Sequence, residues 1–202
     1  MAKRSETHVD ALIIGGGFSG SLLAMILARR GLRVTLIERG SHPRFAIGES
    51  STPTGSMALR RIADTYDLPM LHPFTSYGDW IIRHPNIACG SKRGFSYFFH
   101  TPDTPFEPRA DHANELLVAA SASEKEADTH WYRADVDHFL FEQARALGAT
   151  CLEETTVEQA ELTEQWNVKL NVRGEPISVR ADLTIDASGP DSVMSRVLGI
   201  RE

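Results

Sequence analysis

A glycine-rich segment near the N-terminus constrains the fold more than any other feature of the sequence. Residues Gly15–Gly20 read Gly-Gly-Gly-Phe-Ser-Gly, which satisfies the spacing Gly-x-Gly-x-x-Gly. The apolar run Val9–Ile14 before it predicts a buried parallel strand. Phe18–Arg30 after it is rich in good helix formers and predicts a helix, which Gly31 ends. Arg33–Ile37 predicts a second strand, so the chain opens with a βαβ unit and a right-handed crossover.

The position of the glycine segment between a strand and a helix predicts a dinucleotide site. Gly15 allows the tight turn, Gly17 lets a pyrophosphate approach the backbone, and Gly20 lets the helix lie close to the sheet. The amide groups and the positive dipole at the helix start favour a diphosphate. Glu38 ends the second strand, 21 residues after Gly17, where an acid binds ribose hydroxyls. Three neighbours complete this set of candidate cofactor-binding residues: Phe18, Ser19 and Arg39.

Two other phosphate or nucleophile motifs fail on spacing. A P-loop requires Gly-Lys-Ser/Thr before the helix, and the chain has Ser19-Gly20-Ser21 there. A nucleophile elbow requires Gly-x-Ser-x-Gly. The two candidate segments, Gly17–Ser21 and Gly48–Thr52, both lack the last glycine. Nucleotide binding without a P-loop therefore remains the prediction.

Composition narrows the class of protein. The 202 residues carry 21 Lys and Arg against 27 Asp and Glu, for a net charge of −6, which argues against a nucleic-acid binder. The apolar run Leu22–Ala28 is far too short to span a membrane. Ala11–Ile14 is too short for the apolar core of a signal peptide, so we expect a cytoplasmic protein.

Cysteine and histidine spacing gives no sign of a metal. Cys89 and Cys151 form no disulfide framework and no Cys-x-x-Cys pair. His84, His100 and His112 lack ligand spacing and are expected to be structural or substrate-lining. We therefore expect no metal site.

The remaining elements follow from periodicity and turn residues. A helix is expected to begin near Pro53 and end near Asp67, and a clear amphipathic helix covers Ala134–Leu147. The expected strands are Tyr77–Arg83, Gly94–His100, Ala149–Glu153, Val157–Leu162, Trp166–Val172, Ile177–Arg180 and a final buried strand over Leu183–Asp186. The fold class is thus α/β, Rossmann-like, with a parallel sheet and a further mixed or antiparallel β portion. We expect one cofactor-binding domain over residues 1–202, with 69–130 as an inserted β and loop region that faces substrate and cofactor.

Three later segments identify the cofactor. Pro43–Pro53 reads Pro-Arg-Phe-Ala-Ile-Gly-Glu-Ser-Ser-Thr-Pro, and His130–Asp137 opens the amphipathic helix. Asp186–Ser192 reads Asp-Ala-Ser-Gly-Pro-Asp-Ser, and Arg196 lies just beyond it. Together these segments resemble the flavin-dependent halogenases, within the FAD monooxygenase-fold enzymes. The resemblance covers essentially the whole chain but only about the first half of a family member, so the fold is expected to be incomplete relative to the family.

The resemblance implies that the dinucleotide is FAD, with its ADP half on the glycine segment. Gly48, Glu49 and Ser50 would then lie beside the isoalloxazine, with Ile47 packing on it. The alternative is that Glu49 is a solvent-exposed acidic residue in a loop, with no role in cofactor binding.

Two further parts of the site follow from the same resemblance. Arg133 would face the pyrophosphate, and Asp186 and Gly189 would bring a second backbone turn against the phosphate–ribitol region. The alternatives are a surface residue at a helix start for Arg133 and a turn former at a strand end for Asp186.

Halogenases of this kind also require a lysine. The chain has four, Lys3, Lys92, Lys125 and Lys169, and Lys92 alone precedes a strand dense in aromatics. This segment resembles the lysine segment of halogenases that act on phenols or similar small aromatics. The implied reaction joins reduced FAD, O2 and halide to give hypohalous acid, which Lys92 passes to the substrate as a chloramine or through a hydrogen bond. An exposed turn lysine is the alternative.

The resemblance also implies partners. With no second glycine motif for a nicotinamide, reduced FAD is expected from a separate flavin reductase, and the small aromatic substrate is free or bound to a carrier protein, as in secondary metabolism and antibiotic biosynthesis. The family's Trp-x-Trp-x-Ile-Pro and later Gly-Asp-Ala segments are absent, so we expect weak or no turnover by these 202 residues alone. The alternatives are an FAD monooxygenase or reductase of the same fold, and a truncated, non-catalytic FAD-binding module.

Overall fold

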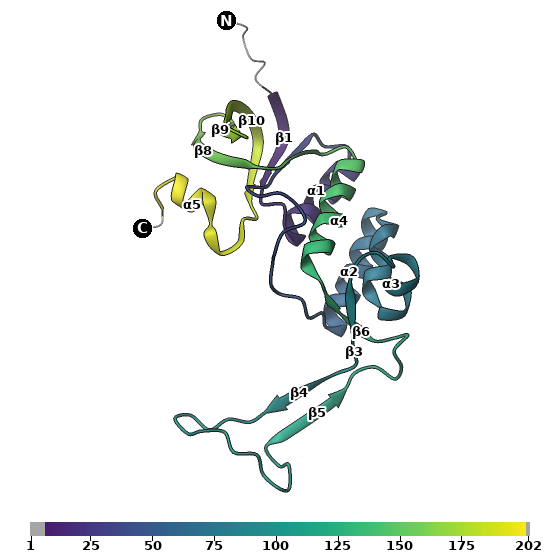
Figure 1. The fold of residues 1–202 in the computed structure, drawn as a ribbon. Helices are drawn as coiled ribbons and strands as arrows, with labels where there is room; N and C mark the ends of the chain where they lie inside the picture. Colours follow the sequence, from purple (N-terminus) through teal and green to yellow (C-terminus); the bar gives the residue numbers. More distant parts are fainter. Residues whose placement is uncertain (1–6, 201–202) are drawn as a thin grey trace, which may run out of the picture. The chain divides into compact units, whose positions relative to one another are not determined.

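The computed structural model describes residues 7–200 and divides the chain into two compact units (Figure 1). The first unit comprises residues 1–47 and 133–202, and the second comprises residues 48–132. None of the helices formed by residues 7–200 combines the length and apolar character needed to cross a bilayer.

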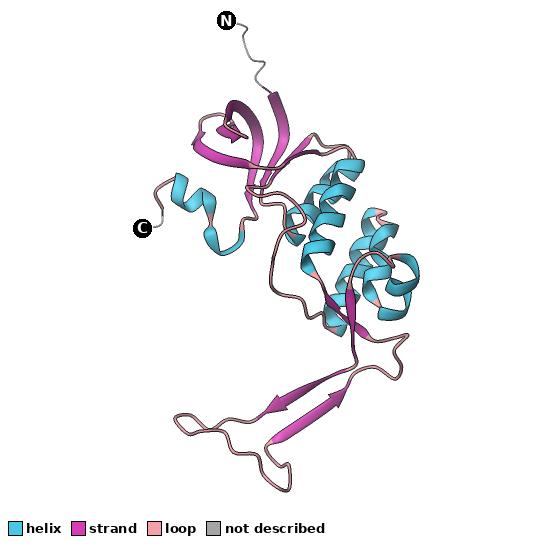
Figure 2. Ribbon diagram, viewed as in Figure 1, coloured by secondary structure: helices cyan, strands magenta, loops and turns pink. Residues whose placement is uncertain are grey.

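The first unit is built on a six-stranded sheet with the strand order β7-β2-β1-β10-β9-β8. Strands are magenta and helices cyan in Figure 2. Neighbouring strands are parallel from β7 to β10, and β9 and β8 continue the sheet in antiparallel pairing. The strand bounds are β1 Thr7–Ile14, β2 Val34–Ile37, β7 Thr150–Leu152, β8 Thr155–Leu162, β9 Trp166–Val172 and β10 Glu175–Asp186. The carboxyl ends of β1, β2 and β10 therefore meet at one edge of the sheet.

Two longer helices pack together in this unit, α1 (Phe18–Arg29) and α4 (Arg133–Ala146). Their buried faces and the central strands form the core, in which Leu12, Met25 and Phe141 are fully buried. Two short helices follow β10, namely η2 (Gly189–Asp191) and α5 (Val193–Val197). The βαβ unit predicted from the sequence is confirmed by β1, α1 and β2.

The second unit combines a helical cluster with two antiparallel ribbons (Figure 1). Phe74 and Trp80 are fully buried in the cluster, with ring centroids 4.5 Å apart, and Trp131 lies 6.1 Å from Trp80. β3 pairs with β6, and β4 pairs with β5. The bounds are α2 Pro53–Tyr66, η1 Pro69–Thr75, α3 Tyr77–Arg83, β3 Cys89–Lys92, β4 Gly94–Phe98, β5 Glu115–Ala119 and β6 Asp128–Trp131.

Three sequence predictions about elements are wrong. Tyr77–Arg83 is a helix and not a strand, because the Ser76 hydroxyl caps it by accepting from the Asp79 amide, while Trp80 turns into the core. The two strands expected after residue 176 are one continuous strand, β10, paired with β1 along its second half. That half is not fully buried either, since Leu183 is 52 % exposed. An apolar run indicates a central strand but not how many of its faces are covered.

Candidate functional site: a cavity at the glycine turn and a lysine on a serine turn

The glycine segment forms a tight turn where β1, α1 and the end of β10 meet. Gly15 adopts a φ of +111°, and a Cβ there would lie 2.5 Å from the Ala187 carbonyl oxygen. A Cβ on Gly20 would overlap the Gly15 carbonyl oxygen, because α1 lies directly on the turn. Gly17 caps the helix without any side-chain hydrogen bond, so the amides of the first turn are left to the backbone and to a ligand.

Gly20→Ala is expected to destabilise the first unit by about 1–3 kcal/mol, because the added methyl forces the helix away from the turn. The urea unfolding midpoint measures the effect. Ser19→Ala, at an exposed position of the same helix turn, is the matched control and is expected to leave the midpoint unchanged. An unchanged midpoint for Gly20→Ala would contradict the close approach of helix and turn.

Glu38 holds the glycine turn from the end of β2. Its side chain is almost fully buried and accepts from the Gly16 amide at 2.9 Å and the Gly40 amide at 3.0 Å. Arg44 Nη2 donates to the same carboxylate at 3.0 Å. Burial raises the pKa of Glu38, but the two amides and Arg44 outweigh it, and the pKa lies below its ordinary value of 4.5.

Glu38→Gln is therefore expected to change how stability depends on pH. A carboxylate with a lowered folded-state pKa stabilises the fold above its unfolded pKa, and that contribution is lost as the pH falls through the folded value. The wild type should lose stability below about pH 4.5 more steeply than Glu38→Gln. Urea midpoints of the two proteins between pH 3 and pH 7 measure the difference, and parallel curves would contradict the pairing.

A buried carboxylate, Asp137, orients two arginines beside the turn. Arg133 donates to it twice, through Nε at 2.7 Å and Nη2 at 2.9 Å. Arg133 Nη1 also donates to the Ile47 carbonyl at 2.9 Å, and Arg44 Nη1 lies 3.9 Å from Asp137. The buried Nε of Arg44 has no hydrogen-bond partner. The guanidinium groups are thus fixed by protein carboxylates, with one donor nitrogen still unsatisfied.

These groups line one cavity of about 680 Å³. Most of the cofactor-binding residues predicted for this unit contribute to its wall, namely Gly15, Gly17, Phe18, Ser19, Glu38, Arg39, Ile47, Arg133 and Gly189. Gly20 does not line it, because it lies under the turn. Gly48, Glu49 and Ser50 belong to the second unit.

Asp186 does not line the cavity but shapes its wall. Its carboxylate accepts from the Ser188 amide at 3.0 Å and the Met194 amide at 2.8 Å. Burial raises the pKa of Asp186, but these donors and the Ser188 hydroxyl hold it below its ordinary range. The carboxylate therefore fixes the turn through Ala187 and Gly189, which does line the cavity.

The sequence analysis missed several lining residues. Arg44 belongs to the segment on which the family resemblance rests. Its position soon after Glu38, the acid that ends the second strand, could have identified it as a candidate site residue. Thr155–Val157 at the start of β8 carry no sequence signal, since a tertiary backbone contact brings them here: the Thr155 amide donates to the Glu38 carbonyl at 2.9 Å. Arg196, noted only for its place after β10, also lines the cavity.

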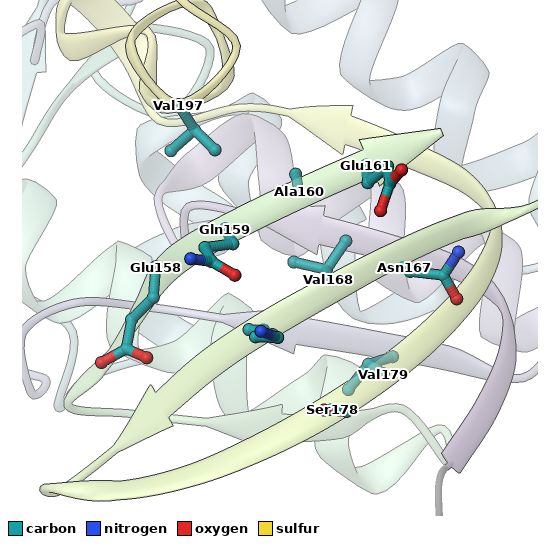
Figure 3. A pocket seen from close by; sticks show the side chains of 10 residues that line it. Glu158, Gln159, Ala160, Glu161, Asn167, Val168, Ser178, Val179 and Val197 are labelled. Carbon is teal, nitrogen blue, oxygen red and sulfur yellow. The ribbon is translucent and has the colours of Figure 1, made fainter. Parts of the chain in front are cut away.

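A second cavity, of about 580 Å³, lies on the face of β8, β9 and β10 (Figure 3). Ala160, Val168 and Val179 from the three strands and Val197 from α5 line it, with polar side chains around them. It contains none of the predicted site residues, and no buried polar atom without a partner is found among its lining residues within the described chain.

Lys92 lies at the end of β3 in the second unit, where it contacts the Gly-Glu-Ser segment. Its Nζ donates to Ser50 Oγ at 2.7 Å and to the Ser51 carbonyl at 2.6 Å. The ammonium also lies 3.9 Å from the centroid of the Phe95 ring. The segment itself is anchored to β6, because the Trp131 amide donates to the Glu49 carbonyl at 2.7 Å. The structure thus brings Lys92 to Glu49 and Ser50, although Ser50 and Lys92 lie 42 residues apart in sequence.

The other lysines have different surroundings. Lys125 and Lys169 are exposed, and Lys3 lies outside the described residues.

The cysteines are free thiols in half-buried positions. Burial raises the pKa of Cys151 to about 12 and also raises the pKa of Cys89. Among residues 7–200, no group of three or more His, Cys, Asp or Glu side chains is placed to hold a metal ion.

Residues 10–200 match the family described as FAD dependent oxidoreductase. Monodechloroaminopyrrolnitrin halogenase PrnC of Pseudomonas fluorescens is 33% identical, over 99% of this chain and 34% of that protein. Tetracycline 7-halogenase of Kitasatospora aureofaciens is 32% identical, over 99% of this chain and 35% of that protein. The chain thus spans about a third of the length of these curated relatives.

Solved structures agree with this assignment. Halogenase PltM in complex with phloroglucinol and FAD superimposes with a TM-score of 0.79 and 31% identity, over 95% of this chain and 36% of that chain. The glycine turn, the acid at the end of β2 and the match over residues 10–200 lead to one assignment: the chain belongs to the FAD dependent oxidoreductase family.

Proposed function

We propose that this chain forms the FAD-binding part of a flavin-dependent halogenase. A separate flavin reductase would supply the reduced FAD. Reduced FAD and O2 together would oxidise halide to hypohalous acid, which would halogenate a small aromatic by electrophilic substitution. The contact of Lys92 with Ser50 is the single observation that carries the proposal.

The cavity of the first unit fits a dinucleotide. Its wall carries four guanidinium groups and one carboxylate, although the chain as a whole is acidic, so the cavity is complementary to a diphosphate. A Cβ on Gly17 would lie 3.3 Å from Arg44 Nη2 and 4.0 Å from Arg133 Nη2, so a side chain there would press into the space between turn and arginines. The unsatisfied Arg44 Nε is a donor for an anionic ligand. We therefore propose that the turn and the arginines hold the diphosphate.

Glu38 would bind the ribose hydroxyls in this arrangement. Its Oε1 accepts one hydrogen bond from the protein, and a carboxylate oxygen can accept more than one. Ile47, whose side chain is 77 % exposed beside the Arg133-bound carbonyl, is proposed to pack on the flavin ring. Gly48, Glu49 and Ser50 are proposed to border the same ring.

Lys92 is the proposed catalytic residue. An ammonium group is a compact donor on a flexible stem, which suits either a chloramine or a hydrogen bond to hypohalous acid. Ser50 Oγ and the Ser51 carbonyl accept two of its three hydrogens, which leaves one N–H for a reactant. The Phe95 ring holds the charge from a further side.

The substrate class rests on the relatives and on the surroundings of Lys92. The relatives are named for monodechloroaminopyrrolnitrin, tetracycline and a carrier-protein-bound pyrrole, and the PltM structure contains phloroglucinol. Exposed aromatic side chains follow Lys92 in the chain, including Tyr97 and Phe99. We propose a small aromatic, free or carrier-bound, within a cytoplasmic pathway of secondary metabolism, and residues 69–130 as the substrate-facing region.

Bromide-dependent product formation tests the proposal. The complete gene product that carries this chain is incubated with FAD, NADH, a flavin reductase, bromide and a panel of phenols and pyrroles, and the products are analysed by mass spectrometry. The expected product carries the isotope pair of bromine and disappears without bromide. Hydroxylated product without bromine would support the monooxygenase alternative, and FAD binding without any product would support a non-catalytic module.

A further inference from the structure

A buried histidine lies directly behind the glycine turn. His42 follows β2, and its side chain is 0 % exposed. Its ring packs on Phe141 of α4, with centroids 4.6 Å apart, and the ring of His138 lies 6.1 Å away. Nothing in the sequence motif assigned a role to this residue.

Both ring nitrogens of His42 face acceptors. Nε2 lies 3.0 Å from the Gly16 carbonyl oxygen, and Nδ1 lies 2.9 Å from Glu153 Oε1. The backbone amide of His42 donates to the same Glu153 oxygen at 2.6 Å. Burial raises the pKa of Glu153, but the amide and ring of His42 outweigh it and the pKa lies below its ordinary value. The glutamate is therefore an ionised acceptor.

A carbonyl oxygen and a carboxylate can only accept, so each ring nitrogen must carry a hydrogen. The ring is then an imidazolium, which is itself buried and pairs with Glu153, whose side chain is 21 % exposed. The other charged groups near the pair are Arg145, which acts on Glu153, and Glu38, which accepts from the Gly16 amide. His138 is the one other titratable group stacked on the ring among the described residues.

The Gly16 peptide groups are thereby held from both sides. The amide donates to Glu38, and the carbonyl accepts from His42 and, at 3.1 Å, from Ser21 Oγ. In a trans peptide the N–H of the next residue points opposite to the carbonyl. Since the Gly16 carbonyl points to buried donors, the Gly17 N–H points away from them, and Gly17 lines the cavity. Hydrogen bonds to the carbonyl also polarise that N–H and make it a stronger donor.

We propose that His42 is a positioning residue for the diphosphate site: its imidazolium, held by Glu153, orients and polarises the Gly16–Gly17 peptide so that the Gly17 N–H donates to the anion. This inference rests on the proposed binding of FAD. It makes the affinity for the diphosphate depend on the two hydrogen bonds of one buried imidazole ring.

The test uses binding and spectroscopy and needs no turnover. ADP and FAD dissociation constants are measured by calorimetry at pH 6 for the wild type, His42→Gln and the matched control His138→Gln. His42→Gln should bind both ligands about 10-fold more weakly than the wild type, as expected for loss of a charged hydrogen bond. His138→Gln should keep the wild-type affinity.

Nitrogen NMR of the wild type, with histidine labelled in the ring, gives an independent readout if a variant fails to fold. Two protonated ring nitrogens on His42 at pH 6 are expected, and one protonated nitrogen would overturn the proposal. An unchanged ADP affinity in His42→Gln, or weaker ADP binding in His138→Gln alone, would also overturn it. Absence of halogenation with intact FAD binding contradicts the proposed function and leaves this inference standing.

Discussion

Lys92→Ala is expected to lower the rate of halogenation by at least about 100-fold, the usual effect of removing a positioned proton donor. Binding of ADP should not change, because Lys92 is not among the residues that line the cavity proposed for the diphosphate. The variant removes the ammonium that Ser50 and Ser51 hold at 2.7 and 2.6 Å and leaves no other donor in its place. The complete gene product is assayed with reductase and bromide under initial-rate conditions.

Two further variants sharpen this prediction. Lys92→Arg keeps the charge but replaces a compact donor with a planar fork, and it is expected to remain severely impaired. Lys169→Ala removes an exposed lysine of β9 and is expected to behave as the wild type. Undiminished halogenation by Lys92→Ala would remove this residue from the reaction.

Gly17→Val is expected to weaken FAD binding by at least about 100-fold, which corresponds to about 2.7 kcal/mol. Gly17 has a φ of −77°, an ordinary value for any residue, so the substitution does not strain the backbone. Its side chain would instead project toward Arg44 and Arg133, where we propose that the diphosphate lies. Flavin absorbance and fluorescence titration measure the dissociation constant.

Comparing side chains of increasing size at position 17 separates a steric effect on FAD binding from an effect on protein stability. Gly17→Ala adds only the Cβ, 3.3 Å from Arg44 Nη2, and should weaken binding much less than valine. Because glycine is a better N-cap than alanine or valine, both variants should still fold but lose some stability, which the urea midpoint measures separately from binding. Wild-type affinity in Gly17→Val would show that the anion does not approach this part of the turn.

The local parts of the site could be predicted from the sequence. The glycine spacing, the strand before it and Glu38 after the next strand are all set within the first 38 residues, where short-range geometry decides the fold. The Lys92 assignment came from the resemblance to halogenases and from its aromatic neighbours. Its contact with Ser50 depends on the pairing of β3 with β6, which the sequence does not reveal.

The parts that depend on tertiary packing could not be predicted. Thr155–Val157 reach the cavity because the Thr155 amide donates to the Glu38 carbonyl just after β2, although β8 joins the sheet at the far edge, beyond β9. The proposed role of His42 depends on Glu153, 111 residues away. Tyr77–Arg83 has the β-branched and aromatic composition of a strand, but the Ser76 cap and the burial of Trp80 favour a helix.

The chemical state of the two thiols has a consequence for durability. The halogenase proposed above would expose its own side chains to a strong electrophile, with which thiolates react more readily than thiols. Burial raises the pKa of Cys151 to about 12 and also raises that of Cys89, which lowers the share of reactive thiolate in both. In the proposed enzyme, this burial would limit oxidation of the two side chains over many catalytic cycles.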